Sequence, residues 1–242
     1  MKILLTNDDG YEAPGLLALY RAVRELGTVH VVAPHQECSA CSHTVTMRRT
    51  VVVERRQRGE MGQVYSVEGT PADCVRIAVS QLLEGPIDLV VSGVNYGANS
   101  GVDVFYSGTV AGAREAAFLG YPAIAVSQAV RAGVATDWPT VTDVVKEIVA
   151  PLLKERLPGP GFWNVNLPAP IPSNAKSKVH RVPIETVAVP PIYERIQRDG
   201  DHIMEFRNGA SYWIRDADGH SDYGVIRNGE IAISAVPLFG RF

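Results

Sequence analysis

The sequence predicts an α/β fold: a Rossmann-like, mainly parallel sheet with helices on both faces, plus a C-terminal β-hairpin extension. Short apolar runs typical of buried strands alternate with amphipathic helical segments through residue 167, and this alternation favours parallel strands joined by helices. After residue 167 the alternation stops, and proline and hairpin signals replace it. We therefore expect one domain over residues 1–242, with an α/β core at 1–167 and a β-rich extension at 168–242.

The first three elements follow from the spacing of apolar residues. Lys2–Thr6 is a short run typical of a buried strand, and Val29–Ala33 is the next one. Between them Pro14 opens a helix, and Gly27 stands where a left-handed C-cap is needed. One face of this helix is apolar and carries Leu16, Leu19, Tyr20, Val23 and Leu26.

The later elements of the core continue the alternation. Thr70, Pro71 and Asp73 indicate a helix start, because a capping hydroxyl, a proline and an acid occupy its first turn. The other predicted elements are strands Ile87–Ser92, Ala123–Ser127 and Phe162–Leu167 and helices Thr109–Leu119 and Val141–Leu153. Pro151 is expected to kink the last helix.

The extension begins with a stretch that contains Pro168, Pro170 and Pro172. Short alternating runs follow it, and three dipeptides between them are hairpin signals: Asp199-Gly200, Asn208-Gly209 and Asn228-Gly229. The segment is too small to build much core of its own. We expect it to pack on the sheet or on another subunit.

Charge and cysteine content bear on partners and compartment. The net charge is −3, from 23 Lys and Arg against 26 Asp and Glu, which argues against binding to a nucleic-acid polymer or an anionic membrane. The first apolar run meets Asp8 and Asp9 too early to form the core of a signal peptide. No stretch approaches the roughly 20 apolar residues that a membrane helix needs. The odd number of cysteines, 3, suits reduced thiols. We expect a cytoplasmic protein.

Two adjacent carboxylates, Asp8 and Asp9, follow the first strand, and Gly10 allows a sharp turn after them. Ligands of parallel α/β sheets bind beyond the carboxyl ends of the strands. Such a pair repels itself unless a cation or solvent screens it, and hard divalent cations prefer oxygen ligands of this type. A cation site and a solvated acidic turn are both open interpretations of this motif.

Two further loops carry groups suited to a phosphate ester. The glycine-rich loop at residues 92–101 offers Asn95, whose amide oxygen could ligate a cation, and Asn99, whose amide could donate to a phosphate. Ser107, Gly108 and Thr109 precede a predicted helix, whose free N–H groups and dipole attract anions. Simple helix capping by Ser107 or Thr109 is compatible with that use.

The loop after the second strand contains Cys38, Ser39, Cys41 and His43. A zinc site is disfavoured because no second Cys or His pair follows at suitable spacing. A thioredoxin-like site is disfavoured because no helix pattern follows the cysteines. Ser39 offers a neutral oxygen, so the four loops together suggest a metal- and phosphate-binding cleft and metal-assisted hydrolysis of a phosphate ester.

In these motifs the chain resembles the SurE family of survival-protein phosphatases, which are 5′/3′-nucleotidases. The resemblance runs from Lys2 to about Leu238. Its most specific parts are the four segments Thr6-Asn7-Asp8-Asp9-Gly10, Gly69-Thr70-Pro71-Ala72-Asp73-Cys74-Val75, Ser92-Gly93-Val94-Asn95-Tyr96-Gly97-Ala98-Asn99 and Tyr106-Ser107-Gly108-Thr109-Val110. Four motifs in this order are far more specific than any one of them.

The resemblance implies one divalent cation per subunit, Mg²⁺ or Mn²⁺, held by Asp8, Asp9, Ser39 and Asn95. It implies hydrolysis of nucleoside 5′- and 3′-monophosphates, and of short polyphosphate in some members, with Asp8 and Asp9 acting through metal-activated water. Asn99, Ser107, Gly108 and Thr109 match the part of the pattern that surrounds the phosphate. The resemblance also implies a homodimer or homotetramer in which the extension reaches a neighbour.

The chain departs from the family pattern at two places. Cys38 and Cys41 flank Ser39 where small or polar residues are expected, and Ser234-Ala235-Val236-Pro237-Leu238 replaces Ser-Ile-Thr-Pro-Leu.

Two other functions remain as alternatives. One is phosphotransfer through an aspartate nucleophile, as in haloacid-dehalogenase-like phosphatases. Those enzymes usually carry Asp-x-Asp, whereas Asp8 and Asp9 are adjacent in this chain. The other is a nucleotide-binding module without catalysis. The glycine-rich loop of this chain does not contain the dinucleotide-binding fingerprint Gly-x-Gly-x-x-Gly.

Overall fold

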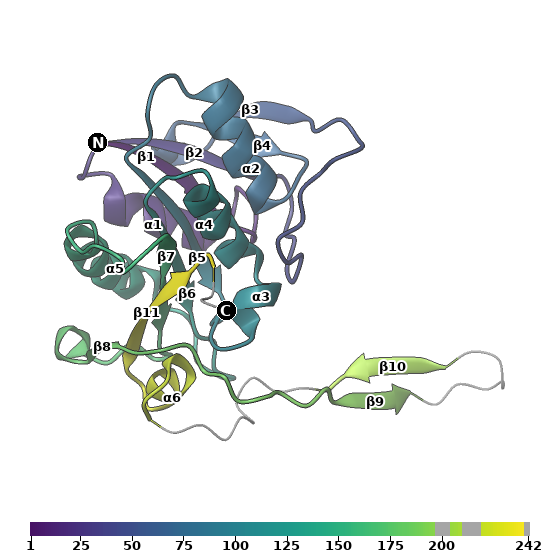
Figure 1. The fold of residues 1–242 in the computed structure, drawn as a ribbon, viewed down its shortest axis with the longest axis vertical. Coiled ribbons are helices and arrows are strands. Elements are labelled where there is room, and N and C mark those ends of the chain that lie inside the picture. The colour runs from purple at the N-terminus through teal and green to yellow at the C-terminus, as the bar shows by residue number, and fades with distance from the viewer. Residues whose placement is uncertain (197–203, 210–218, 240–242) are drawn as a thin grey trace.

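The computed structural model describes residues 1–196, 204–209 and 219–239. Nine strands form one mixed sheet in the order β3-β4-β2-β1-β5-β6-β7-β11-β8, and β9 and β10 form a separate antiparallel pair (Figure 1). The predicted fold class is confirmed. No helix in the described part of the chain has the length and apolar character needed to span a membrane.

The elements of the α/β core lie near their predicted positions. Its strands and helices, in chain order, are β1 (Lys2–Thr6), α1 (Pro14–Val23), β2 (Thr28–Pro34), β3 (Val53–Gln57), β4 (Gln63–Val67), α2 (Pro71–Ile77), β5 (Leu89–Tyr96), α3 (Asp103–Tyr106), α4 (Gly108–Phe118), β6 (Ala123–Gln128), α5 (Trp138–Leu152) and β7 (Gly161–Leu167). Short 3-10 turns lie at Gly59–Met61 and Ala175–Ser177, and a π-helical turn, Ala78–Leu82, continues α2.

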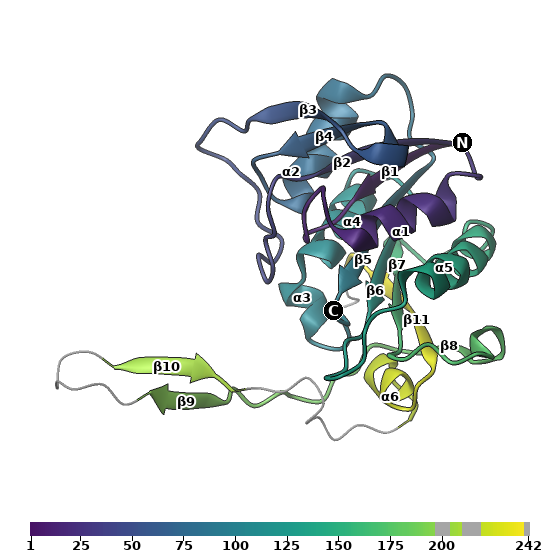
Figure 2. The same cartoon turned by 180° about the vertical axis from the view of Figure 1, so that it is seen from behind.

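Consecutive residues of β1 point to opposite faces of the sheet, so each face has its own core. Ile3 and Leu5 pack with residues of α1 and α5, whereas Leu4 packs with residues of α2 and α4. Helices α2 and α4 lie in front of the sheet in Figure 1, and α1 and α5 lie in front in Figure 2. This two-faced burial explains the continuous apolar run of β1.

The parallel strands β4, β2, β1, β5, β6 and β7 place their carboxyl ends along one edge of the sheet. The chain first builds outward from β1 through β2 and then returns to place β5 on the other side of β1. The gap between β1 and β5 is therefore the topological switch point, where ligands of such sheets bind.

The extension contributes to the main sheet. Its elements are β8 (Val179–Arg181), β9 (Tyr193–Ile196), β10 (Glu205–Asn208), α6 (Asp222–Arg227) and β11 (Ile231–Pro237). β11 pairs antiparallel with β7 and parallel with β8, so the sheet continues beyond Leu167. The β9–β10 pair stands away from the body of the molecule in both views (Figures 1 and 2).

One local prediction was wrong. Asn228-Gly229 does not form a hairpin: Gly229, at φ +77°, follows the C-terminal end of α6, which begins at Asp222 and is capped by the hydroxyl of Ser221. Pro151 lies inside α5, one residue before the helix ends at Leu152, and the kink at this residue stays a prediction. Asn208-Gly209 lies at the end of β10, and Asp199-Gly200 falls outside the described residues.

Candidate active site at the β1–β5 switch point

Asp8 lies at the carboxyl end of β1 and is buried, with 4% of its surface exposed. Its Oδ1 accepts a hydrogen bond from the hydroxyl of Thr109, and the backbone N–H groups of Gly108 and Thr109 also point at this carboxylate. Burial raises the pKa of Asp8, and these hydrogen bonds oppose the rise. The N-terminal end of α4 thus holds the carboxylate of Asp8.

Position 108, where α4 begins, has no room for a side chain because the helix start lies in contact with Asp8. A Cβ at this position would lie 2.8 Å from the Asp8 Cβ, 2.8 Å from the Cys41 Sγ and 2.9 Å from the Asp8 Oδ2. Ser107 caps the helix through a hydrogen bond of 3.0 Å from the Val110 N–H to its Oγ. Three residues of the predicted phosphate set, Ser107, Gly108 and Thr109, therefore adjoin Asp8.

Asp9 reaches across the switch point to β5. Its Oδ2 accepts a hydrogen bond of 3.1 Å from the backbone N–H of Tyr96. Burial, with the neighbouring charges of Asp8 and Glu37, raises the pKa of Asp9 to about 6. No Lys, Arg or His forms an ion pair with Asp8 or Asp9 within residues 1–196, 204–209 and 219–239.

Asn95 and Tyr96 are the last two residues of β5. Its Nδ2 donates a hydrogen bond of 2.7 Å to the carbonyl of Gly97, which leaves the side-chain oxygen as the open end of the amide. Gly97 has φ +140°, a backbone conformation that glycine allows without a steric penalty. The turn therefore places an oxygen donor on the strand end that also binds Asp9.

Ser39 lies on an exposed turn beside the site. The backbone N–H of Cys38 donates to the Asp8 carbonyl at 2.8 Å, which fixes the turn next to β1. The hydroxyl of Ser39, however, donates to the carboxylate of Glu37. The structure thus brings the Ser39 turn to the site, where its hydroxyl bonds Glu37 rather than Asp8 or Asp9.

Asn99 lies deeper, at the carboxyl ends of β6 and β7. Its Nδ2 donates to the Ser127 Oγ at 2.8 Å, and its carbonyl accepts from the amides of Asn164 and Asn166 at 2.8 and 3.0 Å. The Asn166 Oδ1 also accepts from the Asn99 N–H at 2.8 Å. These contacts anchor the glycine-rich loop. Sequence reasoning missed the two β7 asparagines, although two amides in a buried apolar strand were a visible signal.

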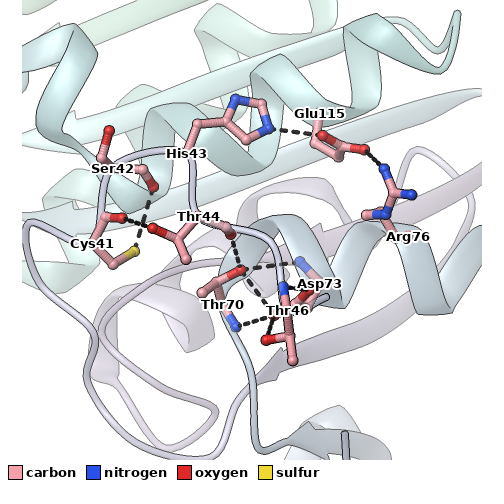
Figure 3. A network of polar contacts seen from close by, with 9 residues as sticks. All are labelled: Cys41, Ser42, His43, Thr44, Thr46, Thr70, Asp73, Arg76 and Glu115. Atoms are coloured by element: carbon pink, nitrogen blue, oxygen red, sulfur yellow. Dashed lines mark hydrogen bonds and ion pairs between the residues drawn. The ribbon is translucent and has the colours of Figure 1, made fainter. Parts of the chain in front are cut away.

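A second network anchors the loop after β2, as Figure 3 shows. The Nε2 of His43 lies 2.7 Å from one oxygen of Glu115, and Arg76 donates to the other at 2.8 Å. Glu115 lies on α4 and is 4% exposed. Although burial opposes it, the bonds from His43 and Arg76 lower the pKa of Glu115. Sequence reasoning did not single out this residue.

Asp73 holds the same loop at a second point (Figure 3). Its carboxylate accepts from the Thr46 backbone N–H at 2.9 Å and from the Thr46 hydroxyl at 2.7 Å, and it completes a capping box with Thr70. Burial opposes ionisation, but these bonds lower the pKa of Asp73. The loop from Cys41 to Thr46 is therefore fixed to α2 and α4.

Paired oxygen ligands without a cationic partner fit a hard divalent cation better than a soft one. Asp8, Asp9 and the Asn95 oxygen supply such donors, and Ser39 stands on the adjoining turn. In the described part of the chain, no three His, Cys, Asp or Glu residues form a metal-holding group. A hard cation such as Mg²⁺ is usually held by one or two carboxylates and completes its coordination shell with water or substrate oxygens.

The structure defines a doubly wound α/β protein with two acidic side chains, Asp8 and Asp9, at its switch point. The family model described as "Survival protein SurE" matches residues 3–188, so the chain belongs to the SurE family, as its four motifs predicted. The protein named 5′-nucleotidase SurE of Geobacter sulfurreducens is 37% identical over 249 residues, which cover 98% of this chain and 88% of that protein.

Other relatives agree with this assignment. The 5′-nucleotidase SurE of Alkalilimnicola ehrlichii is 39% identical over 252 residues, covering 98% of this chain and 90% of its own. The crystal structure of the SurE protein from Aquifex aeolicus matches with a TM-score of 0.83 and 31% identity, over 100% of this chain and 95% of that one. The similarity therefore includes the extension as well as the α/β core.

Proposed function

We propose that this chain is a divalent-metal-dependent phosphomonoesterase that hydrolyses nucleoside 5′-monophosphates to nucleoside and phosphate. Membership of the SurE family and full-length relatives named 5′-nucleotidase support the class of enzyme. The observation that supports the metal dependence is the pair of buried Asp8 and half-buried Asp9 at the switch point, which has no ion-pair partner among the described residues. Nucleoside 3′-monophosphates and short polyphosphate are proposed as further substrates.

Asp8, Asp9, Asn95 and Ser39 would hold one Mg²⁺ or Mn²⁺ per subunit. Such a cation, when bound, polarises the phosphoryl group and lowers the pKa of water that attacks it. The chain contributes fixed positions for these ligands: Thr109 and the α4 N-terminus orient Asp8, and the Tyr96 N–H orients Asp9. Preorganised ligands of this kind need little rearrangement during the reaction.

Ser107, Gly108, Thr109 and Asn99 would surround the phosphate. The N-terminal end of α4 already stabilises the carboxylate of Asp8, and its positive dipole end favours negative charge on a phosphoryl group beside it. Tyr96 and Tyr106 flank these residues in the chain and are 55% and 58% exposed. Their rings offer a surface on which a base could stack without base-specific contacts.

We also propose that the chain forms a homodimer or homotetramer through the extension. Tyr193 and Arg195 lie on one face of β9, and Phe206 lies directly opposite Arg195 on β10. Tyr193 and Phe206 are 63% and 56% exposed on that face. An isolated two-stranded hairpin is marginally stable in water, so an apolar face on this projecting pair favours contact with a second copy.

The variants Asp8→Asn and Asp9→Asn test the assignment of the site. Each should reduce phosphate release from a nucleoside 5′-monophosphate at least 10³-fold, because loss of a charged ligand weakens the cation site, while circular dichroism stays unchanged. Asp88→Asn is the matched control, since Asp88 is exposed before β5 at the opposite edge of the sheet and bonds the Lys2 N–H. Full activity in both site variants would refute the assignment.

Two measurements on the wild-type protein distinguish the alternatives left open by the sequence. An aspartyl nucleophile at Asp8 would form a phosphorylated enzyme that acid quenching and mass spectrometry detect. A binding module without catalysis would bind nucleotide and release no phosphate under any metal. We expect turnover without a phosphorylated aspartate.

A further inference from the structure

Cys38 and Cys41 bracket the turn that carries Ser39. The two central residues of the turn are Ser39 and Ala40, and Ala40 has φ +54°. Both thiols are free and half-buried, they stand three positions apart on one turn, and the Cys41 thiol donates a hydrogen bond of 3.5 Å to the Ser42 carbonyl. The turn therefore brings two reduced thiols together across a residue proposed to hold the cation.

Hydrogen bonds anchor the backbone on both sides of the cysteine pair. The Cys38 N–H is bonded to the Asp8 carbonyl at 2.8 Å, and the Ser42 N–H is bonded to the Tyr106 carbonyl at 2.9 Å. The Ser42 hydroxyl also donates to the Phe105 carbonyl at 2.7 Å. Only the segment between these anchors, including Ser39 and Ala40, has no such backbone bond to the neighbouring elements among the described residues.

We propose that Cys38 and Cys41 are a redox modification site, in which a low-molecular-weight disulfide oxidises them reversibly to an intramolecular disulfide that displaces Ser39. The substrate class is a small dialkyl disulfide such as oxidised glutathione. The effect on the cation rests on the proposed function, whereas formation of the disulfide does not depend on it.

The exchange is balanced in two steps. One cysteine thiolate attacks a sulfur of the small disulfide, a protein–small-molecule disulfide forms, and one small thiol leaves. The second cysteine sulfur attacks the protein sulfur of this mixed disulfide, the Cys38–Cys41 bond forms, and the second small thiol leaves. Two electrons pass from the protein to the oxidant, and the two cysteine protons end on the two released thiols.

Forming the bond draws the two sulfur atoms together. An S–S bond is about 2.05 Å long, which is shorter than the separation of two unbonded thiol sulfurs, and it fixes the two Cβ atoms about 3.8 Å apart. Cys41 also packs against Gly108 at the start of α4, where a Cβ would lie 2.8 Å from its sulfur. Because Cys38 and Ser42 are anchored, the turn between them absorbs the movement, and Ser39 moves with it.

The first test detects the bond itself. The full-length protein is incubated with oxidised glutathione, its remaining thiols are alkylated, and peptide mass spectrometry locates the linkage. We expect a Cys38–Cys41 disulfide that dithiothreitol reverses, with Cys74, which is buried on α2, alkylated only after unfolding. Alkylation of Cys38 and Cys41 after every oxidation would overturn the proposal.

The second test measures the consequence for the cation. Mn²⁺ binding to the reduced and oxidised wild-type protein is compared by electron paramagnetic resonance, and we expect at least tenfold weaker binding after oxidation. Cys38→Ser and Cys41→Ser should each abolish the redox difference, and Cys74→Ala should keep it. Equal Mn²⁺ affinity in both states of a disulfide-bonded wild type would overturn the displacement of Ser39.

Failure of the two proposals can be told apart. If the reduced wild type binds no Mn²⁺ while the disulfide forms, the proposed metal site is wrong and the redox site stands. If the reduced protein binds Mn²⁺ and no disulfide forms, the proposed metal site stands and the redox site is wrong.

Discussion

The hydroxyl of Thr109 donates a hydrogen bond to the Oδ1 of Asp8, and this contact joins two residues 101 positions apart in the chain. Asp8 lies two residues after the end of β1, and Thr109 lies in the first turn of α4. The sequence suggested that the N-terminal end of this helix binds an anion. In the structure it binds the carboxylate of Asp8. This relationship explains how an acid with 4% exposure is kept beside Asp9.

Thr109→Val should weaken this support without a large change of volume. A hydrogen bond to a charged group is worth about 1.5–3 kcal/mol, and the bond from Thr109 lowers the pKa of Asp8, so its loss raises that pKa further. We expect the acidic limb of the pH profile of phosphate release to move to higher pH. Thr109→Ser keeps the hydroxyl and should behave as the wild type, and an unmoved limb in the valine variant would contradict the role.

Asp9→Asn should stabilise the protein in EDTA. In the folded state burial and the charge of Asp8 raise the pKa of Asp9 from its ordinary value of 3.8 to about 6. Between these values the folded state binds more protons than the unfolded state, so stability falls as pH rises from about 4 to about 6. Asparagine avoids this loss, which is on the order of 1–2 kcal/mol at pH 7 once partial exposure is considered.

Urea unfolding at pH 4 and pH 7 checks this sign. The variant should exceed the wild type at pH 7 in EDTA, and the difference should vanish near pH 4. Saturating Mg²⁺ should stabilise the wild type and leave the variant unchanged, because only a ligand of the folded state adds stability. A wild type more stable than the variant in EDTA at pH 7 would show that Asp9 has a cationic partner.

Glu115→Gln should destabilise the loop after β2. Glu115 is buried between His43 and Arg76, and removing one charge of a buried ion pair leaves the others uncompensated. We expect a loss of about 1–3 kcal/mol in the free energy of unfolding. Glu25→Gln is the control, because Glu25 pairs with Lys146 on the surface and its removal should not change the unfolding midpoint.

The apolar face of the hairpin should control assembly. Replacing Tyr193 and Phe206 with serine removes both exposed rings from one face of β9–β10. Sedimentation velocity should then show a smaller assembly than the wild type at equal concentration. Glu194→Ser, on the opposite face of β9, should leave the mass unchanged, and an identical mass in both variants would place the interface elsewhere.

The α/β core was predictable because its helices and strands repeat local patterns of apolar residues. α1 and β7 follow directly from such patterns, and α2 from its Thr70 capping box. β3 and β4 escaped prediction because β3 is mostly exposed and its strand character depends on pairing with β4. Asn228-Gly229 was assigned to a hairpin because the same dipeptide suits both a hairpin turn and the end of a helix.

The residues of the candidate site were predictable where adjacent positions carried the signal. Asp8 and Asp9 stand together in the sequence, and the switch point brings the Tyr96 N–H to Asp9. Glu115 could not be found in the same way, because its partner His43 is 72 residues away. Asn99 was assigned to phosphate, and the contacts with Ser127 and Asn166 that anchor it arise only when β6 and β7 pair.

The central claim is metal-dependent hydrolysis of nucleotide monophosphates at Asp8 and Asp9. The most direct test is phosphate release from a panel of nucleoside 5′- and 3′-monophosphates and tripolyphosphate, with Mg²⁺ or Mn²⁺ and again with EDTA. The account predicts release from 5′-monophosphates with either cation and at least a hundredfold loss in EDTA that added metal restores. Equal release in EDTA, or no release with any cation, would contradict it.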